Sequence, residues 1–292
     1  MDKILNPALV VLFSIVWSSA FIVGKLALSS IGVFTLLTER FLLSAIILAP
    51  FCIRHLPVLF QTRTILLGLT LGLMNNALYL GLTFSALMTV RPELVVVVVS
   101  CAPFITMVAA FALGLDRVDG HKIAGTTLGF LGVVMISGIG TPARPDPVGL
   151  SFAIAGTVAF SLATVLFRGK ARRLPIVPVN FWQSVAGVLA LAPIAMARGE
   201  TFALPSATAM FAISYLAIGV TIGGMALWLL LIRKSGAATA SSYHLLNPFI
   251  GIVLSHVVFD RPIRSIDVLG AGLIALALSW TTRVRRRAAS VR

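Results

Sequence analysis

The sequence is poor in charged residues, and acidic residues are the rarest of them. Only nine of its 292 residues are Asp or Glu, and all charged residues together make up 11% of the chain. A soluble domain carries about 25% charged residues. Hydrophobic residues account for 59% of the chain. This composition excludes an ordinary water-soluble protein and leaves no room for a separate soluble domain.

Cysteine and histidine are also scarce, which argues against disulfide and metal chemistry. Cys52 and Cys101 lie in different apolar segments, so we expect neither a disulfide nor a metal-binding pair. The four histidines, which show no ligand spacing such as H-x-x-x-H, are His55, His121, His244 and His256. The sequence therefore predicts no metal site and no cofactor.

Groups that perform catalysis inside a membrane are missing as well. Glu39 is the only carboxylate well inside an apolar run, because Glu93 and Asp267 fall at the starts of runs. No nucleophile can be paired with a base along the chain. A membrane-embedded enzyme is therefore disfavoured, and we predict no catalytic residue.

Long apolar runs are what the chain has in abundance. A helix that spans a bilayer needs about 20 consecutive apolar residues. Ten such runs are present, at 7–28, 33–53, 64–84, 93–113, 121–139, 148–167, 177–197, 207–231, 238–258 and 266–283. The first run is too long for a cleaved signal peptide and lacks a small-residue cleavage site. We predict an all-α polytopic membrane protein with ten transmembrane helices.

The positive charge is distributed as membrane topology requires. The net charge is +14, and 16 of the 23 Lys and Arg residues fall on the side that holds both termini. Such an excess marks the cytoplasmic side. We therefore expect both termini in the cytoplasm, a lipid bilayer as partner, and no nucleic acid. The tail "RVRRRAASVR" (283–292) is interpreted as a signal that fixes topology, with contact to anionic lipid as the alternative.

The two halves of the chain repeat each other. Pro103-Phe104-Ile105 recurs as Pro248-Phe249-Ile250 at an offset of 145, and "VWSSAFIVGK" (16–25) matches "AFSLATVLFR" (159–168) at an offset of 143. Five helices per half is an odd number, so the second half must enter the membrane from the opposite side. We predict inverted repeats over 1–140 and 141–292 around a central cavity, an arrangement common in secondary transporters. A channel, which needs a filter and usually a symmetric oligomer, is disfavoured.

Several short motifs occur in the order of a known family. "VWSSAF", "TERFLLSA", "SCAPF" followed by "GLDRVDGHKIAG", and "LLNPF" with "DRPIRSIDVLGAGLI" resemble the EamA-type branch of the drug/metabolite transporter superfamily. The chain departs from the family at Asp116-Arg117 and Asp260-Arg261, where Glu-Arg is usual. The resemblance implies ten helices, a central cavity and export of amino acids or other small metabolites across the bacterial inner membrane. Within the family, exporters of aromatic and other amino acids are the nearest match.

Polar and aromatic residues inside the runs predict the substrate site. Polar groups at membrane depth face the bundle interior or a wet cavity, because lipid offers them no partner. Asn75 and Tyr79 share one helix face, as do Tyr243 and Asn247. The predicted substrate-binding residues are Trp17, Ser18, Asn75, Tyr79, Ser100, Phe160, Ser161, Trp182, Tyr243 and Asn247. Such a lining suits a zwitterion with an apolar side chain, and hydrogen bonding between helices is the competing interpretation.

A second group of residues is assigned to gating or packing. Pro103 and Pro248 each remove a backbone donor near mid-helix, so we expect kinks there. Glu39 is either a charged gate at the outer cavity mouth or part of a neutralised cluster, with Lys25 as its partner. His244 is interpreted as a packing residue rather than a proton carrier. Trp228 and Trp280 are alternatively interfacial belt residues.

The function predicted from these features is secondary transport of a small molecule by alternating access. Few titratable groups are available for coupling, so we expect transport without obligatory proton or sodium coupling. A proton-coupled drug/metabolite antiporter is the alternative. The substrate and the oligomeric state stay open at this point.

The topology gives a direct prediction. Cysteines introduced near each terminus should react with a membrane-impermeant reagent only from the cytoplasmic side, because the Lys and Arg excess is on that side. A labelling map that places the two termini on opposite faces would disprove the ten-helix arrangement.

Overall fold

The computed structural model describes residues 7–90, 95, 98–116, 120–137, 146–202, 205–259 and 262–290. Throughout these residues the secondary structure is helical, with no strand. Four predicted features fall partly or wholly outside them: Glu93, the Asp-Arg motifs at Arg117 and at Asp260-Arg261, most of the loop between the halves, and the chain ends. The predicted all-α fold is confirmed.

The described residues form ten helical rods, several of which are built from consecutive segments. In chain order they are α1 (Pro7–Ala27); α2 (Val33–Cys52) with η1 (Ile53–His55) and α3 (Leu56–Leu59); α4 (Thr62–Gly72) with η2 (Leu73–Leu80) and α5 (Gly81–Thr89); α7 (Ala102–Ala112); α8 (Gly120–Ser137); α9 (Pro147–Leu166) with η3 (Phe167–Ala171); α10 (Ile176–Ala197); α11 (Ala207–Tyr215) with η4 (Leu216–Gly224) and α12 (Met225–Ser235); α13 (Ala237–Ser242) with η5 (Tyr243–Leu246) and α14 (Asn247–Phe259); and α15 (Ser265–Ser290).

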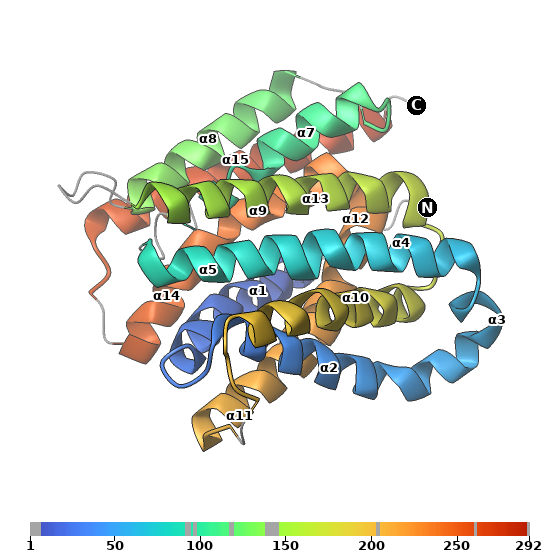
Figure 1. The fold of residues 1–292 in the computed structure, drawn as a ribbon. Helices are drawn as coiled ribbons and strands as arrows, with labels where there is room; N and C mark the ends of the chain where they lie inside the picture. The colour runs from blue at the N-terminus through green and yellow to red at the C-terminus, as the bar shows by residue number, and fades with distance from the viewer. Residues whose placement is uncertain are drawn as a thin grey trace.

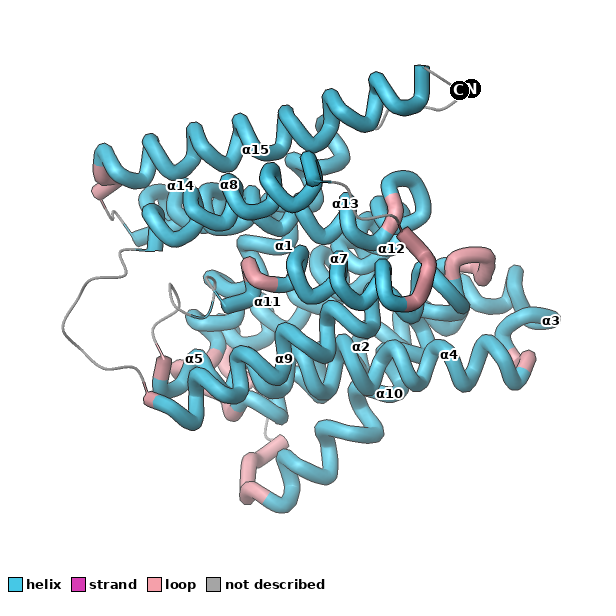
Figure 2. Tube along the Cα trace, turned by 90° about the horizontal axis from the view of Figure 1, so that it is seen from above, coloured by secondary structure: helices cyan, strands magenta, loops and turns pink. Residues whose placement is uncertain are grey.

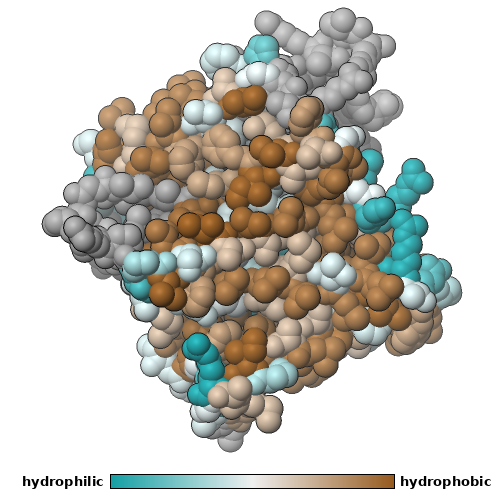
Figure 3. Space-filling view, turned by 45° about the horizontal axis from the view of Figure 1, so that its top comes forward, coloured by the Kyte–Doolittle hydropathy of each residue, from teal (hydrophilic) through white to brown (hydrophobic). Residues whose placement is uncertain are grey.

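The surface of the bundle is apolar, as a lipid-facing surface must be. Six helices of the described chain are long and apolar enough to cross a bilayer, and shorter apolar helices lie at Ala102–Ala112, Ile123–Met135 and Ser265–Ala277. Large apolar side chains such as Ile46, Phe111 and Leu189 are mostly exposed. Figure 3 shows apolar residues over most of one face, with hydrophilic side chains gathered near its right-hand edge and lower corner. This pattern is that of a polytopic membrane protein.

Two helix pairs lie at opposite ends of the bundle. The pair α8 and α15 packs together at one end, and the pair α2 and α10 packs together at the other (Figures 1 and 2). Between them run α9, the rod from α4 to α5, and α1, whereas the rod from α11 to α12 begins at the lower edge of Figure 1, beyond α10 and α2. Each end pair joins corresponding helices of the two halves. The centre is therefore enclosed by helices from both halves.

The same irregular turns recur in both halves. The π-helical segments η2 and η4 begin at Leu73 and Leu216, an offset of 143, in the third and eighth rods. A π-helical turn widens the helix, and such turns concentrate at functional sites. Since propensity alone does not favour them, their recurrence at matching places supports the repeat that the sequence predicts.

Both mid-helix prolines lie directly after a break rather than inside a bent helix. The Cys101 amide donates to Val98 O over 3.0 Å in a tight turn before α7, and the 3-10 turn η5 precedes α14. Pro103 and Pro248 are the second residues of α7 and α14. Proline is tolerated there because the first turn of a helix leaves its amides without intrahelical acceptors. The predicted kinks are therefore interruptions that precede each proline.

Two serines bind these breaks in the same way. Ser18 on α1 donates its hydroxyl to Asn247 O over 3.0 Å, and Ser161 on α9 donates to Ala102 O over 3.3 Å. The acceptors are the first residues of α14 and α7. Each serine thus ties the first helix of one half to the broken helix of the other. A two-fold relation between the halves predicts this reciprocal pattern.

A carboxylate links the start of α9 to the end of α5. Asp146 caps α9 by accepting from the Gly149 amide over 2.9 Å, and it also accepts from Thr89 Oγ1 at the end of α5 over 2.7 Å. The Thr89 hydroxyl, followed by the Gly149 amide, lowers the pKa of the Asp146 carboxyl. A lowered pKa means that this contact stabilises the fold at neutral pH and is lost as the pH falls through the folded-state pKa.

Glycine allows the third rod to approach α10 closely. A Cβ at Gly72 would lie 2.5 Å from Gln183 O and 2.6 Å from Gln183 Cα, which are backbone atoms. Gly72→Ala should lower the free energy of unfolding by about 1–3 kcal/mol, because overpacking exceeds the gain of about 1 kcal/mol in helix propensity. Thermal unfolding of the purified protein measures the change. Gly251→Ala on α14, where no atom lies within 4 Å, is the control; an equal effect of both substitutions would contradict the packing argument.

Candidate functional site

A small cavity lies in the centre of the bundle, between the two halves. Its volume is about 20 Å³. The first half contributes residues of α1, α2, η2 and α5, and the second half contributes residues of α9, η4 and α12. The lining residues are Trp17, Ala20, Phe21, Arg40, Asn75, Asn76, Tyr79, Leu80, Phe84, Phe160, Val220, Thr221 and Met225. The cavity lies between the two halves, in the region where the sequence predicts a central cavity.

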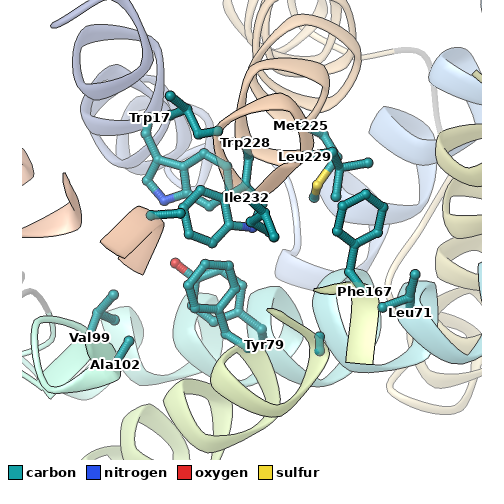
Figure 4. Close-up of a cluster of buried hydrophobic side chains, with 14 of the residues drawn as sticks. Trp17, Leu71, Tyr79, Val99, Ala102, Phe167, Met225, Trp228, Leu229 and Ile232 are labelled. Carbon is teal, nitrogen blue, oxygen red and sulfur yellow. The ribbon is translucent and has the colours of Figure 1, made fainter. Parts of the chain in front are cut away.

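Aromatic rings form one wall of this cavity. The centroid of the Phe160 ring lies 4.7 Å from that of Tyr79 and 5.9 Å from that of Trp17. Trp228 stacks on Phe160 with centroids 5.4 Å apart. Figure 4 shows Tyr79 and the two tryptophans facing one another across the cluster. Offset and tilted pairs at these distances are favourable aromatic geometries.

His244 lies at the centre of the aromatic wall. Its ring makes edge contacts with Phe13, Trp17, Phe160 and Trp228, with centroids 4.7–5.2 Å apart. Asn247 Nδ2 lies 2.8 Å from His244 Nδ1, whereas Nε2 has no hydrogen-bond partner among the described residues. The histidine therefore packs as an aromatic residue whose polar edge turns toward the helix break.

Arg40 is the charged group of the site. Its side chain is only 3% exposed and lines the cavity from α2. Nε donates to Thr221 Oγ1 over 2.6 Å, and the guanidinium lies over the Phe41 ring at 5.4 Å. Nη1 has no hydrogen-bond partner among the described residues. An arginine stays protonated even when buried, so one of the residues that line the cavity carries a positive charge.

Two neighbouring amides add neutral acceptors to the site. Asn75 Nδ2 donates to Gln183 Oε1 over 3.0 Å, and Asn76 Nδ2 donates to Gln183 O over 2.8 Å. The Oδ1 atoms of both asparagines are buried without a partner within the described chain. The π-helical turn η2 presents both side chains to the cavity together with Tyr79. The site thus combines a cation, two amide oxygens and an aromatic wall.

Four of the ten predicted substrate-binding residues line the cavity: Trp17, Asn75, Tyr79 and Phe160. Ser18 and Ser161 are buried but hold the helix breaks, as described above. Ser100, Tyr243 and Asn247 lie at or beside those breaks and are not among the lining residues. For the serines, the competing interpretation of hydrogen bonding between helices is the one that the contacts favour.

Two tryptophans occupy other positions than those expected. Trp182 faces away from the cavity: its indole N–H donates to Leu59 O over 3.0 Å, while the next residue, Gln183, turns inward. Neighbouring residues on a helix point about 100° apart, so only one of them can face the centre. Trp228 is 1% exposed in the aromatic wall and is not a belt residue. Trp280 is half exposed, as a belt position requires.

Within the described chain, Glu39 does not form the expected ion pair with Lys25. Lys25 Nζ donates to Leu87 O over 3.4 Å, and Glu39 is not among the residues that line the cavity. Its side chain is partly exposed, and the Arg40 side chain beside it is buried. The same rotation of about 100° separates the two neighbours. Arg40, not Glu39, is the charged residue that α2 directs to the centre.

Sequence reasoning therefore missed Arg40, together with Asn76, Thr221 and Met225. A signal for Arg40 was present in the repeat. Position 183 corresponds to position 40 at the offset of 143, and Gln183 is polar and fully buried. A buried polar residue at both related positions indicates that this face of α2 and α10 turns inward. No cluster of potential metal ligands occurs in the described part of the chain.

Broken helices from two repeated halves around a central cavity are typical of secondary membrane transporters. Comparison with known proteins specifies the family. The sequence model of the EamA-like transporter family matches twice, at residues 7–138 and 147–283. The chain belongs to this family of transporters.

Individual relatives and a solved structure agree with the assignment. The chain is 26% identical over 271 residues to "Uncharacterized inner membrane transporter YedA" of Escherichia coli K12, covering 92% of this chain and 87% of the relative. It is 26% identical over 282 residues to "Uncharacterized transporter YvbV" of Bacillus subtilis, covering 96% and 91%. A crystal structure shares the fold with a TM-score of 0.78 at 21% identity, covering 96% of this chain and 97% of the other.

Proposed function

We propose that this transporter carries amino acids or closely related metabolites through the central cavity by alternating access. The two units that move would be the halves 1–140 and 141–292, with both termini in the cytoplasm of a bacterial cell and export as the direction. The observation that carries the proposal is the Arg40 guanidinium, which faces the same cavity as the aromatic wall. A cation beside apolar rings suits a ligand that bears both a carboxylate and an apolar side chain.

Each chemical part of such a ligand has a counterpart in the site. Arg40 Nη1 is available to donate to a carboxylate, which forms stronger hydrogen bonds with guanidinium than with neutral donors. The Oδ1 atoms of Asn75 and Asn76 are available to accept from an ammonium group. Trp17 and Phe160 offer apolar surface to the side chain. A site that satisfies both charged groups favours a zwitterion over an uncharged drug.

Under this proposal, the small size of the cavity corresponds to a closed form of the transporter. A volume of about 20 Å³ accommodates roughly one water-sized group, far less than the space an amino acid needs. Binding therefore requires the helices to separate. The breaks before Pro103 and Pro248 and the π-helical turns η2 and η4 interrupt regular α-helical hydrogen bonding, so we expect the rods to bend there.

The composition of the cavity supports transport without an obligatory proton or sodium ion. Such coupling usually needs a carboxylate or histidine that meets the substrate and reaches both sides of the membrane. None of the described lining side chains is acidic. His244 is 1% exposed and enclosed by four aromatic rings. Export would then follow a high cytoplasmic concentration of substrate.

A substitution in the aromatic wall tests the substrate role of the cavity. Tyr79→Ala should lower the uptake of labelled amino acids into proteoliposomes about 3- to 10-fold, because the ligand loses one aromatic contact. Phe211→Ala, which removes an aromatic side chain that is 67% exposed, is the matched control and should leave flux unchanged. Normal flux in well-folded Tyr79→Ala would rule out a substrate contact by this residue.

Imposed gradients test the proposed lack of coupling. In proteoliposomes, amino-acid flux should follow the substrate gradient and change less than about twofold when a pH or sodium gradient is imposed, because none of the described lining residues is acidic. Accumulation of substrate against its gradient, driven by a pH gradient, would instead favour a proton-coupled antiporter. Loss of that accumulation in His244→Gln would then identify His244 as the proton carrier.

A further inference from the structure

The charge on Arg40 needs a counter-charge whenever no substrate is bound. Its side chain is 3% exposed, and the guanidinium keeps its charge at any physiological pH. The side chains that line the cavity within the described chain include no Asp or Glu. An isolated buried charge costs several kcal/mol of desolvation unless it is paired. The closed protein is therefore expected to recruit an anion.

Two residues that line the cavity each have a buried hydrogen-bond donor without a partner among the described residues. Arg40 uses Nε to bind Thr221, but Nη1 has no partner among the described residues. Tyr79 Oη is likewise buried without a hydrogen-bond partner among the described residues. Arg40 and Tyr79 both line the same cavity. A positive donor and a hydroxyl donor together match a single negatively charged acceptor.

The dimensions select a small ion. A cavity of about 20 Å³ holds roughly one water-sized group, and a monatomic anion is close to that size. A water molecule would supply an acceptor but would not neutralise the guanidinium. The surrounding rings, Trp17, Phe21 and Phe84, favour a weakly hydrated ion over a strongly hydrated one such as sulfate. Chloride and bromide meet these conditions.

We propose that the closed, substrate-free protein binds a monovalent inorganic anion, chloride, between Arg40 Nη1 and Tyr79 Oη. The anion neutralises the guanidinium while the cavity is too small for a metabolite. On opening, the carboxylate of the substrate displaces it. Only this displacement rests on the proposed function; the binding of the anion itself does not.

Halide binding is measurable on the purified protein without a transport assay. The melting temperature should be about 2–5 °C higher in sodium chloride or bromide than in sodium gluconate at equal ionic strength, because a ligand of the native state stabilises it. The shift should saturate with halide concentration. An unchanged melting temperature in halide would overturn the proposal.

Two variants separate binding at Arg40 from a general salt effect. Arg40→Met keeps the length of the side chain and removes its charge, so the difference between halide and gluconate should vanish. Arg198→Met is the matched control, because Arg198 also lies over a phenyl ring, that of Phe34 at 5.2 Å, but is exposed outside the cavity. It should retain the halide shift of the wild type. An equal shift in Arg40→Met and the wild type would contradict the site.

A structural measurement covers the case in which Arg40→Met does not fold. Crystals of the wild-type protein grown in bromide should show an anomalous peak beside Arg40 Nη1, and crystals without such a peak would refute the proposal. Amino acids that lower the halide shift would demonstrate displacement by a carboxylate. A halide shift that no amino acid affects would count against the proposed substrate while leaving the anion site intact. Saturable amino-acid flux without a halide shift would contradict the anion site while supporting the proposed substrate.

Discussion

The centre of this protein depends on two reciprocal hydrogen bonds, in which the first helix of each half holds the broken helix of the other half. Two rods are interrupted before Pro103 and Pro248, and each interruption disturbs the regular hydrogen bonding of the helix. In a membrane protein such irregular backbone is tolerated only where it is buried in protein or lines a cavity. Ser18 and Ser161 each donate a hydroxyl to a carbonyl at the break in the opposite half. These bonds hold both broken helices against the first helix of the other half, and the cavity opens beside them. The breaks, the serines and the site therefore form one arrangement rather than three separate features.

The two halves agree in geometry but differ in chemistry at the centre. Arg40 and Gln183 occupy corresponding positions, yet one brings a charge into the cavity while the other binds the amides of Asn75 and Asn76. The aromatic wall is similarly shared, since Trp17 and Phe160 correspond and face each other across the interface at 5.9 Å. A repeat conserves the backbone that the membrane demands and leaves individual side chains free to specialise. The proposed substrate chemistry arises from that specialisation.

The sequence predicts most of the fold because hydrophobic length and the repeat act over whole helices. It predicts less of the site because the direction of a side chain depends on helix phase. Glu39 and Arg40, or Trp182 and Gln183, differ by about 100° of rotation, and local composition does not say which member faces inward. The π-helical turns add a second difficulty, because each changes the phase of the residues that follow it. Trp228, four residues beyond η4, is buried in the aromatic wall although its position in the run equally suits a lipid interface. Trp17 and Phe160, which occupy related positions in the two halves, both line the cavity, whereas Trp182 and Tyr243 do not.

The presence of Arg40 in only one half has a kinetic consequence for a passive carrier. Inverted halves with identical side chains would make the inward-open and outward-open forms mirror each other, with equal affinities on both faces. Under the proposed mechanism a single cation would break that equivalence, because the substrate would sit in one orientation and meet different partners at each opening. Thermodynamics still requires zero net flux at equal concentrations. Any difference in half-saturation between the two faces must therefore be offset by an equal ratio of maximal velocities. Far from equilibrium, such a carrier would move substrate faster in one direction than in the other. It would still not accumulate substrate against its concentration gradient.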